Sequence, residues 1–124
     1  MPDPVHSESS QPIDFSTVLE RIGGDVSFLQ ELLDLYSQEF AEKKHLLEEA
    51  LARGDSTQIQ EVGHSLKGAS ANLSLAPLQR LSLAIEMAGR ENDLEKARQA
   101  IGALGTEFIR LKTFLEVHPL EELG

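Results

Sequence analysis

The spacing of the apolar residues constrains the fold of this chain more than any other feature. Near the C-terminus these residues recur in alternating steps of three and four, which is the period of a helix that packs along one face. They are Leu94, Ala97, Ile101, Leu104, Phe108, Leu111 and Leu115. No segment alternates with the period of two that is typical of a half-buried strand. The chain is therefore predicted to be all-α.

Glycine, aspartate and proline divide the rest of the sequence into further helices. A short helix over residues 13–22 ends at a Gly-Gly pair, and Asp25 can then cap a long helix that runs to about residue 53. Asp55 can cap the next helix, and Pro77 suits the first turn of the one after it. We expect an antiparallel four-helix bundle with a short extra N-terminal helix.

Each long helix is expected to bury one apolar stripe. The stripe expected in the long second helix comprises Phe28, Leu29, Leu32, Leu35, Tyr36, Phe40, Leu47 and Leu51. In the third helix it comprises Ile59, Val62, Leu66, Ala69 and Leu73, and in the fourth Leu78, Leu81, Ile85 and Ala88. A single domain over residues 13–118 follows, with residues 1–12 as a flexible leader and residues 119–124 as a C-terminal tail.

Charge and composition exclude several classes of function. Twenty-one acidic residues against eleven basic ones give a net charge of −10, which disfavours binding to nucleic acid. The sequence has no cysteine, no signal peptide and no apolar run long enough to span a membrane. We expect a cytoplasmic, monomeric protein that contacts neither nucleic acid nor membrane, and Met1 with the short leader favours a free-standing one.

His64 stands apart from the buried stripe of its helix. At about 100° per residue it lies roughly 160° from the nearest stripe residues, so its imidazole is expected to face solvent. Lys67 and Gly68 follow one turn further along this face, and Ala71 another turn beyond. A glycine inside a helix costs about 0.8–1 kcal/mol relative to alanine and needs a reason. Gly68 leaves clearance for an approaching partner, and Gly63 is interpreted as allowing close helix packing.

A known family shares these features. The segment HSLKGASANL at residues 64–73 closely resembles the signature of the histidine phosphotransfer (HPt) domains of bacterial and eukaryotic phosphorelays. The resemblance extends to Gly-Gly-Asp at residues 23–25 and to residues 81–86, and it covers roughly residues 13–116. The sequence departs from the family at Ser74, where many members carry glycine.

The resemblance implies a phosphorelay intermediate and not an enzyme. His64 would accept a phosphoryl group on Nε2 from the phosphoaspartate of a receiver domain and pass it to another receiver. Glu86 would accept a hydrogen bond from Nδ1–H and so orient the ring, and Lys67 would neutralise the phosphoryl oxygens. The residues expected to contact the partner are Gln60, Ala71 and Arg90.

The partners that the resemblance implies are response-regulator receiver domains and a hybrid sensor histidine kinase. No cofactor is expected on this chain, and Mg²⁺ is expected only on the partner receiver. The sequence has no Gly-rich ATP-binding segment, so it should not phosphorylate itself. One alternative stays open, a helical docking module that binds receivers without transferring phosphate. A metal-binding bundle is disfavoured, because the expected buried stripes lack inward-facing Glu and His residues.

Overall fold

A computed structural model describes residues 11–120 of the chain, and five helices make up its secondary structure. They are α2 (Phe15–Arg21), α3 (Val26–Arg53), α4 (Ser56–Asn72), α5 (Ala76–Arg90) and α6 (Leu94–Val117). The described residues contain no strand, so the all-α prediction is confirmed for them. Most of the expected leader (residues 1–10) and of the expected tail (residues 121–124) lies outside the described residues.

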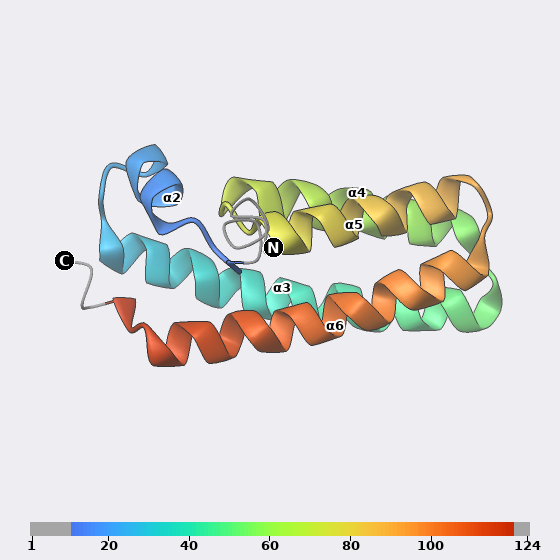
Figure 1. Cartoon of the computed structure of the whole chain (residues 1–124). Helices are drawn as coiled ribbons and strands as arrows, with labels where there is room; N and C mark the ends of the chain where they lie inside the picture. The colour runs from blue at the N-terminus through green and yellow to red at the C-terminus, as the bar shows by residue number, and fades with distance from the viewer. Residues whose placement is uncertain (1–10, 121–124) are drawn as a thin grey trace, which may run out of the picture.

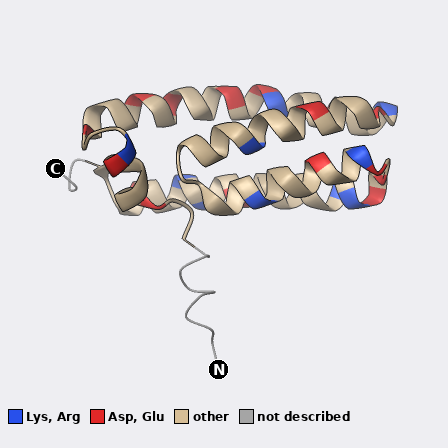
Figure 2. Cartoon of the chain, turned by 90° about the horizontal axis from the view of Figure 1, so that it is seen from above, with Lys and Arg blue, Asp and Glu red and all other residues tan. Residues whose placement is uncertain are grey.

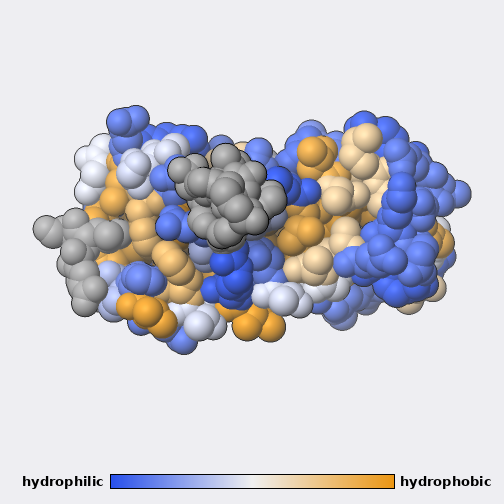
Figure 3. All heavy atoms as spheres, viewed as in Figure 1, coloured by the Kyte–Doolittle hydropathy of each residue, from blue (hydrophilic) through white to orange (hydrophobic). Residues whose placement is uncertain are grey.

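Helices α3 to α6 pack side by side around one core. The main contacts join α3 to α4 and α6, and α5 to α4 and α6. Successive long helices run in opposite directions, and α2 lies at one end of them (Figure 1). Acidic and basic residues are spread along the helices (Figure 2). On the face shown in Figure 3, hydrophilic residues predominate at the end at which α3 turns into α4 and α5 into α6. Within residues 11–120, no helix is both long and apolar enough to cross a bilayer.

Aspartate side chains start four of the five helices. Each accepts a hydrogen bond from the backbone N–H three residues later and so satisfies one donor that the first turn of a helix leaves unpaired. The four N-caps are Asp14, Asp25, Asp55 and Asp93. The remaining helix, α5, starts instead with proline in its first turn. The helix starts predicted at Asp25, Asp55 and Pro77 are therefore confirmed.

The core is apolar and draws on every helix. Among its fully buried side chains are Val18, Leu29, Leu47, Ile59, Leu66, Leu78, Ile85, Leu104 and Leu111. The predicted stripes of α4 and α5 lie in the core, with Ala69 and Leu81 only partly buried. In α3 the predicted stripe is wrong at Phe28 and Leu35, which are 43% and 61% exposed, whereas the omitted Leu33 is buried. This long helix carries apolar residues on several sides, and the positions of its neighbours decide which of them are covered.

One polar pair lies inside the core. The hydroxyl groups of Tyr36 on α3 and Ser70 on α4 are 2.8 Å apart, and both residues are buried. The hydrogen bond satisfies two groups that would otherwise be buried without a partner. Burial raises the pKa of Tyr36 to about 12. The pair therefore joins α3 to the helix that carries His64.

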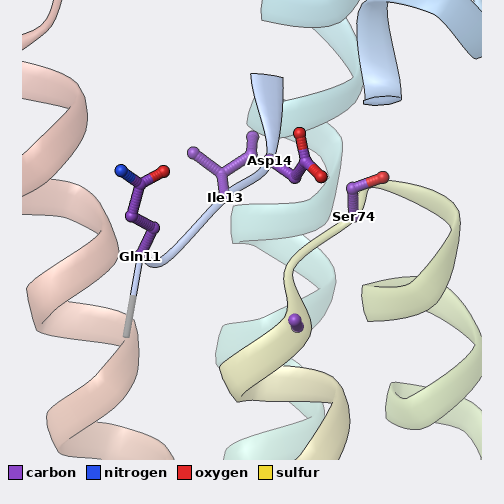
Figure 4. A pocket seen from close by; sticks show the side chains of 5 residues that line it. Gln11, Ile13, Asp14 and Ser74 are labelled. Carbon is purple, nitrogen blue, oxygen red and sulfur yellow. The ribbon is translucent and has the colours of Figure 1, made fainter. Parts of the chain in front are cut away.

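Helix α2 is hydrogen-bonded to the C-terminal end of α4. Nη1 of Arg21 donates hydrogen bonds to the carbonyl oxygens of Ala71 and Asn72, each at 2.9 Å. Helix α4 has no basic residue in its own last turn, so Arg21 supplies the positive charge that a helix C-terminus favours. The backbone N–H of Asp14 donates to the carbonyl of Ser74 at 3.0 Å, and these two residues lie close together in Figure 4. Ser74 adopts φ +57°, the left-handed conformation that glycine adopts most easily.

Candidate functional site

The imidazole of His64 projects from the middle of α4 into solvent. Its side chain is 68% exposed, as the helical spacing predicts. Ile59, Val62 and Leu66 on the opposite face of the same helix are buried and fix which way the helix is turned. An incoming group can therefore reach the ring.

The buried carboxylate of Glu86 on α5 holds one nitrogen of this ring. Nδ1 of His64 lies 3.0 Å from Oε2 of Glu86, and Glu86 is only 4% exposed. An ionised carboxylate only accepts hydrogen bonds, so Nδ1 carries the hydrogen and donates it. In the neutral ring, Nε2 then carries a free lone pair. The sequence interpretation of Glu86 as the partner of Nδ1 agrees with this geometry.

Two cations meet the same carboxylate. Nζ of Lys67 lies 2.7 Å from Oε1 of Glu86, and Nη2 of Arg90 lies 3.3 Å from Oε2. The pKa of Glu86 is lowered, chiefly by the contact with Lys67 and further by the hydrogen bond from His64, while burial acts in the opposite direction. Glu86 therefore stays ionised at neutral pH. The sequence did not predict that Lys67 pairs with Glu86 in the unphosphorylated protein.

A hollow of about 430 Å³ opens beside the imidazole. It is lined by Thr57, Gln60, Glu61, His64, Glu86 and Arg90. Two of the three expected contact residues, Gln60 and Arg90, thus lie next to His64. Ala71 does not line the hollow, and its carbonyl accepts a hydrogen bond from Arg21. Thr57 and Glu61 were missed, although they precede His64 by seven and three residues and so share its helix face.

The two glycines around His64 differ in their surroundings. Gly68 is exposed, and a Cβ atom added there would meet nothing within 4 Å. Gly63 is buried, and an added Cβ would lie 2.7 Å from the backbone nitrogen of Glu86. The surface beside the imidazole is thus open at Gly68, and Gly63 lies in a close contact between α4 and α5, as predicted.

No metal site accompanies this arrangement in the part of the chain that the structure describes. Residues 11–120 contain no group of three or more His, Cys, Asp or Glu side chains that could hold an ion. The chemistry available here is that of an exposed nucleophilic nitrogen held beside a buried carboxylate and two cations.

Comparisons with known proteins agree with the geometry. The family model described as the Hpt domain matches residues 31–114. Histidine-containing phosphotransfer protein B (HptB) from Pseudomonas aeruginosa PAO1 has a similar structure, with a TM-score of 0.78. The two sequences are 22% identical, and the alignment covers 86% of this chain and 93% of the other. This likeness shows a shared fold. No curated protein sequence matches the chain.

Proposed function

This chain belongs to the Hpt domain family, and from that premise we propose that Nε2 of His64 carries a phosphoryl group from one receiver domain to another. Membership of the family gives the chain a phosphotransfer role in two-component signalling. One observation carries the assignment to His64. Its ring is exposed and bound through Nδ1 to a buried carboxylate, which leaves Nε2 free to attack.

The proposed step needs no base on this chain. The lone pair on Nε2 forms the N–P bond while the P–O bond of the aspartyl phosphate breaks, and its electron pair leaves with the aspartate carboxylate. Nδ1 keeps its hydrogen throughout, so the phosphorylated ring carries a positive charge. Glu86, 3.0 Å away, stabilises that charge. Because no proton has to be returned, the same contacts serve transfer in either direction.

Lys67 has two anionic partners in this proposal. In the unphosphorylated protein it neutralises Glu86, and its side chain is 30% exposed. It lies one turn after His64, so its flexible stem can bring Nζ to a phosphoryl oxygen once the group arrives. Arg90 stays on Glu86 and keeps that carboxylate paired when Lys67 leaves. Gly68 leaves room for the receiver that brings the phosphoryl group.

Members of this family are phosphocarriers that interact with receiver domains and histidine kinases. For this chain we propose receiver domains as direct partners and a hybrid sensor kinase as the source of phosphate. It acts as a monomer without kinase activity of its own. We also infer that the architecture is an antiparallel four-helix bundle in which α2 is the short extra N-terminal helix.

The test is incubation of the purified protein with a phosphorylated receiver domain. We expect His64→Gln to stay folded and to take up no acid-labile phosphate, because glutamine has no nucleophilic ring nitrogen. The matched control is His45→Gln, since His45 is similarly exposed but pairs with Glu49 of its own helix, α3. Full labelling of His64→Gln would refute the assignment. Receiver binding without any labelling of the parent would favour the docking module instead.

A further inference from the structure

Two glycines lie in close contacts between α4 and α5. Gly63 and Gly89 are buried within their helices, and neither adopts the left-handed conformation that would itself call for glycine. A Cβ atom on Gly63 would lie 2.7 Å from the backbone nitrogen of Glu86 and 3.0 Å from its Cα. A Cβ atom on Gly89 would lie 2.5 Å from the backbone nitrogen of Gln60 and 2.8 Å from the carbonyl oxygen of Ser56. Each glycine thus lies against the backbone of the other helix.

These contacts differ from those of the other glycines within helices. Gly68 and Gly102 face open space, and an added Cβ on Gly105 would meet only the flexible end of Lys44. Ordinary van der Waals contact begins at 3.4 Å. The Cβ added at Gly63 would be 0.7 Å closer than this to its nearest neighbour, and the Cβ added at Gly89 would be 0.9 Å closer. The nearest atoms are backbone atoms, so no side-chain rotation can make room. The helices themselves would have to move apart.

The contact at Gly63 is directly coupled to the ring of His64. Gly63 precedes His64 in α4, and the backbone that it touches belongs to Glu86, which holds Nδ1. This hydrogen bond is 3.0 Å long, and separating the helices by about 0.7 Å would take it beyond ordinary hydrogen-bond length. Arg90 lies on α5 with Glu86 and would move with it. Lys67 has a long flexible stem that could follow, whereas the imidazole is short and rigid.

We propose that Gly63 and Gly89 are positioning residues for His64. By letting the backbones of α4 and α5 touch, they bring Glu86 within reach of Nδ1 and so hold Nε2 in its nucleophilic tautomer. The proposal rests on the proposed phosphotransfer at His64 for its effect on rate. Its structural part, the control of the tautomer, is measurable without any transfer.

The first experiment compares Gly63→Ala with the parent by ¹⁵N NMR of the unphosphorylated imidazole, at a pH where the ring is neutral. We expect the parent to hold its hydrogen on Nδ1 and the variant to show a mixture of the two tautomers, as we also expect for Glu86→Ala, which removes the acceptor of Nδ1–H. Transfer from a phosphorylated receiver should be roughly tenfold slower in the variant, as expected for a misplaced reacting group. Gly89→Ala should shift both quantities in the same direction.

Gly102→Ala is the matched control, because it adds the same methyl group inside a helix where nothing lies within 4 Å. It should match the parent in tautomer and in rate. A folded Gly63→Ala protein with the parent's tautomer would overturn the proposal. If Gly63→Ala does not fold, Glu86→Asp is the substitute test. The shorter aspartate side chain moves the carboxylate away from Nδ1 of His64 and leaves the backbone contact between Gly63 and residue 86 unchanged. Retention of the Nδ1–H tautomer in Glu86→Asp would also overturn the proposal, because reach would then not be limiting.

The two proposals fail in different ways. If the parent takes up no phosphoryl group while Gly63→Ala still changes the tautomer, the proposed function is wrong and the positioning role stands. If the parent transfers phosphate and the tautomer is indifferent to Gly63, the positioning role is wrong and the proposed function stands.

Discussion

The ion pair between Lys67 and Glu86 should contribute measurably to the stability of the unphosphorylated protein. Its two charged atoms are 2.7 Å apart, and the side chain of Glu86 is only 6% exposed while that of Lys67 is 30% exposed. Exposed pairs contribute about 0–1 kcal/mol, and removing one partner of a fully buried pair costs about 3–5 kcal/mol. This pair lies between these limits, and Glu86 keeps His64 and Arg90 as partners. We therefore expect Lys67→Ala to lower the free energy of unfolding by about 1–2 kcal/mol.

A double-mutant cycle isolates the contribution of the pair. Urea unfolding of the parent, Lys67→Ala, Glu86→Gln and the double variant, followed by far-UV circular dichroism, should give a coupling free energy of about 1 kcal/mol at pH 7. The pKa of Glu86 is lowered in the folded protein, so its ionised form stabilises the folded state. This contribution to the free energy of unfolding is complete above the ordinary pKa of a glutamate and is lost as the pH falls through the lowered pKa. The coupling should therefore disappear in acid.

Lys44 and Glu48 on α3 provide the matched control pair. Their charged atoms are also 2.7 Å apart, but the side chain of Glu48 is 54% exposed. The same cycle on this pair should give about 0.5 kcal/mol or less. If the coupling at Lys67 and Glu86 were no larger than this, burial of Glu86 would not strengthen the pair, and the reasoning would be refuted.

Three further perturbations follow from the structure. Arg21→Ala should lower the free energy of unfolding by about 1–2 kcal/mol, because the last carbonyls of α4 lose a charged donor; unchanged urea unfolding would contradict this. In the parent, the free energy of unfolding should fall by about 2 kcal/mol as the pH rises from 10 to 12, since the raised pKa of Tyr36 favours its neutral form in the folded protein. Tyr36→Phe should lack that part of the alkaline loss, and identical pH profiles would refute the assignment. Gly68→Gln should leave the free energy of unfolding unchanged or raise it by under about 1 kcal/mol, because open space surrounds Gly68. The glutamine side chain should nevertheless slow transfer from a receiver, because it would fill the space through which the receiver approaches; parent-like transfer rates would refute the clearance argument.

Local signals in the sequence were enough to predict most of the fold. Asp25 and Asp55 start helices because a carboxylate can accept the free N–H groups of the first turn, and this depends only on neighbouring residues. The direction of His64 follows in the same way from the angle between successive residues of a helix. Phe28 and Leu35 could not be placed by periodicity alone, because their exposure depends on where α4 and α6 lie.

The candidate site was predictable to the same extent. The signature segment was enough to single out His64 as the candidate residue, and the family resemblance suggested Glu86, whose carboxylate lies 3.0 Å from Nδ1, as its partner. The contact between Lys67 and Glu86 joins two helices, so it depends on their separation and on the burial of the carboxylate. Gly63 was recognised as a packing residue, but only the structure shows that Glu86 is the residue it packs against. Distances between helices are set by the whole core and have no local signal.

The buried pair of Tyr36 and Ser70 also gives this protein an intrinsic optical probe. Tyr36 is the only tyrosine in a chain without tryptophan, so the near-ultraviolet emission of the protein comes almost entirely from one ring. That ring is hydrogen-bonded to α4 six residues beyond His64. Its emission and absorbance therefore report on the junction of α3 and α4 without any attached dye. A tryptophan-bearing receiver could then be observed separately in the same cuvette, and a change confined to the tyrosine signal would mean that binding disturbs the interior of the bundle.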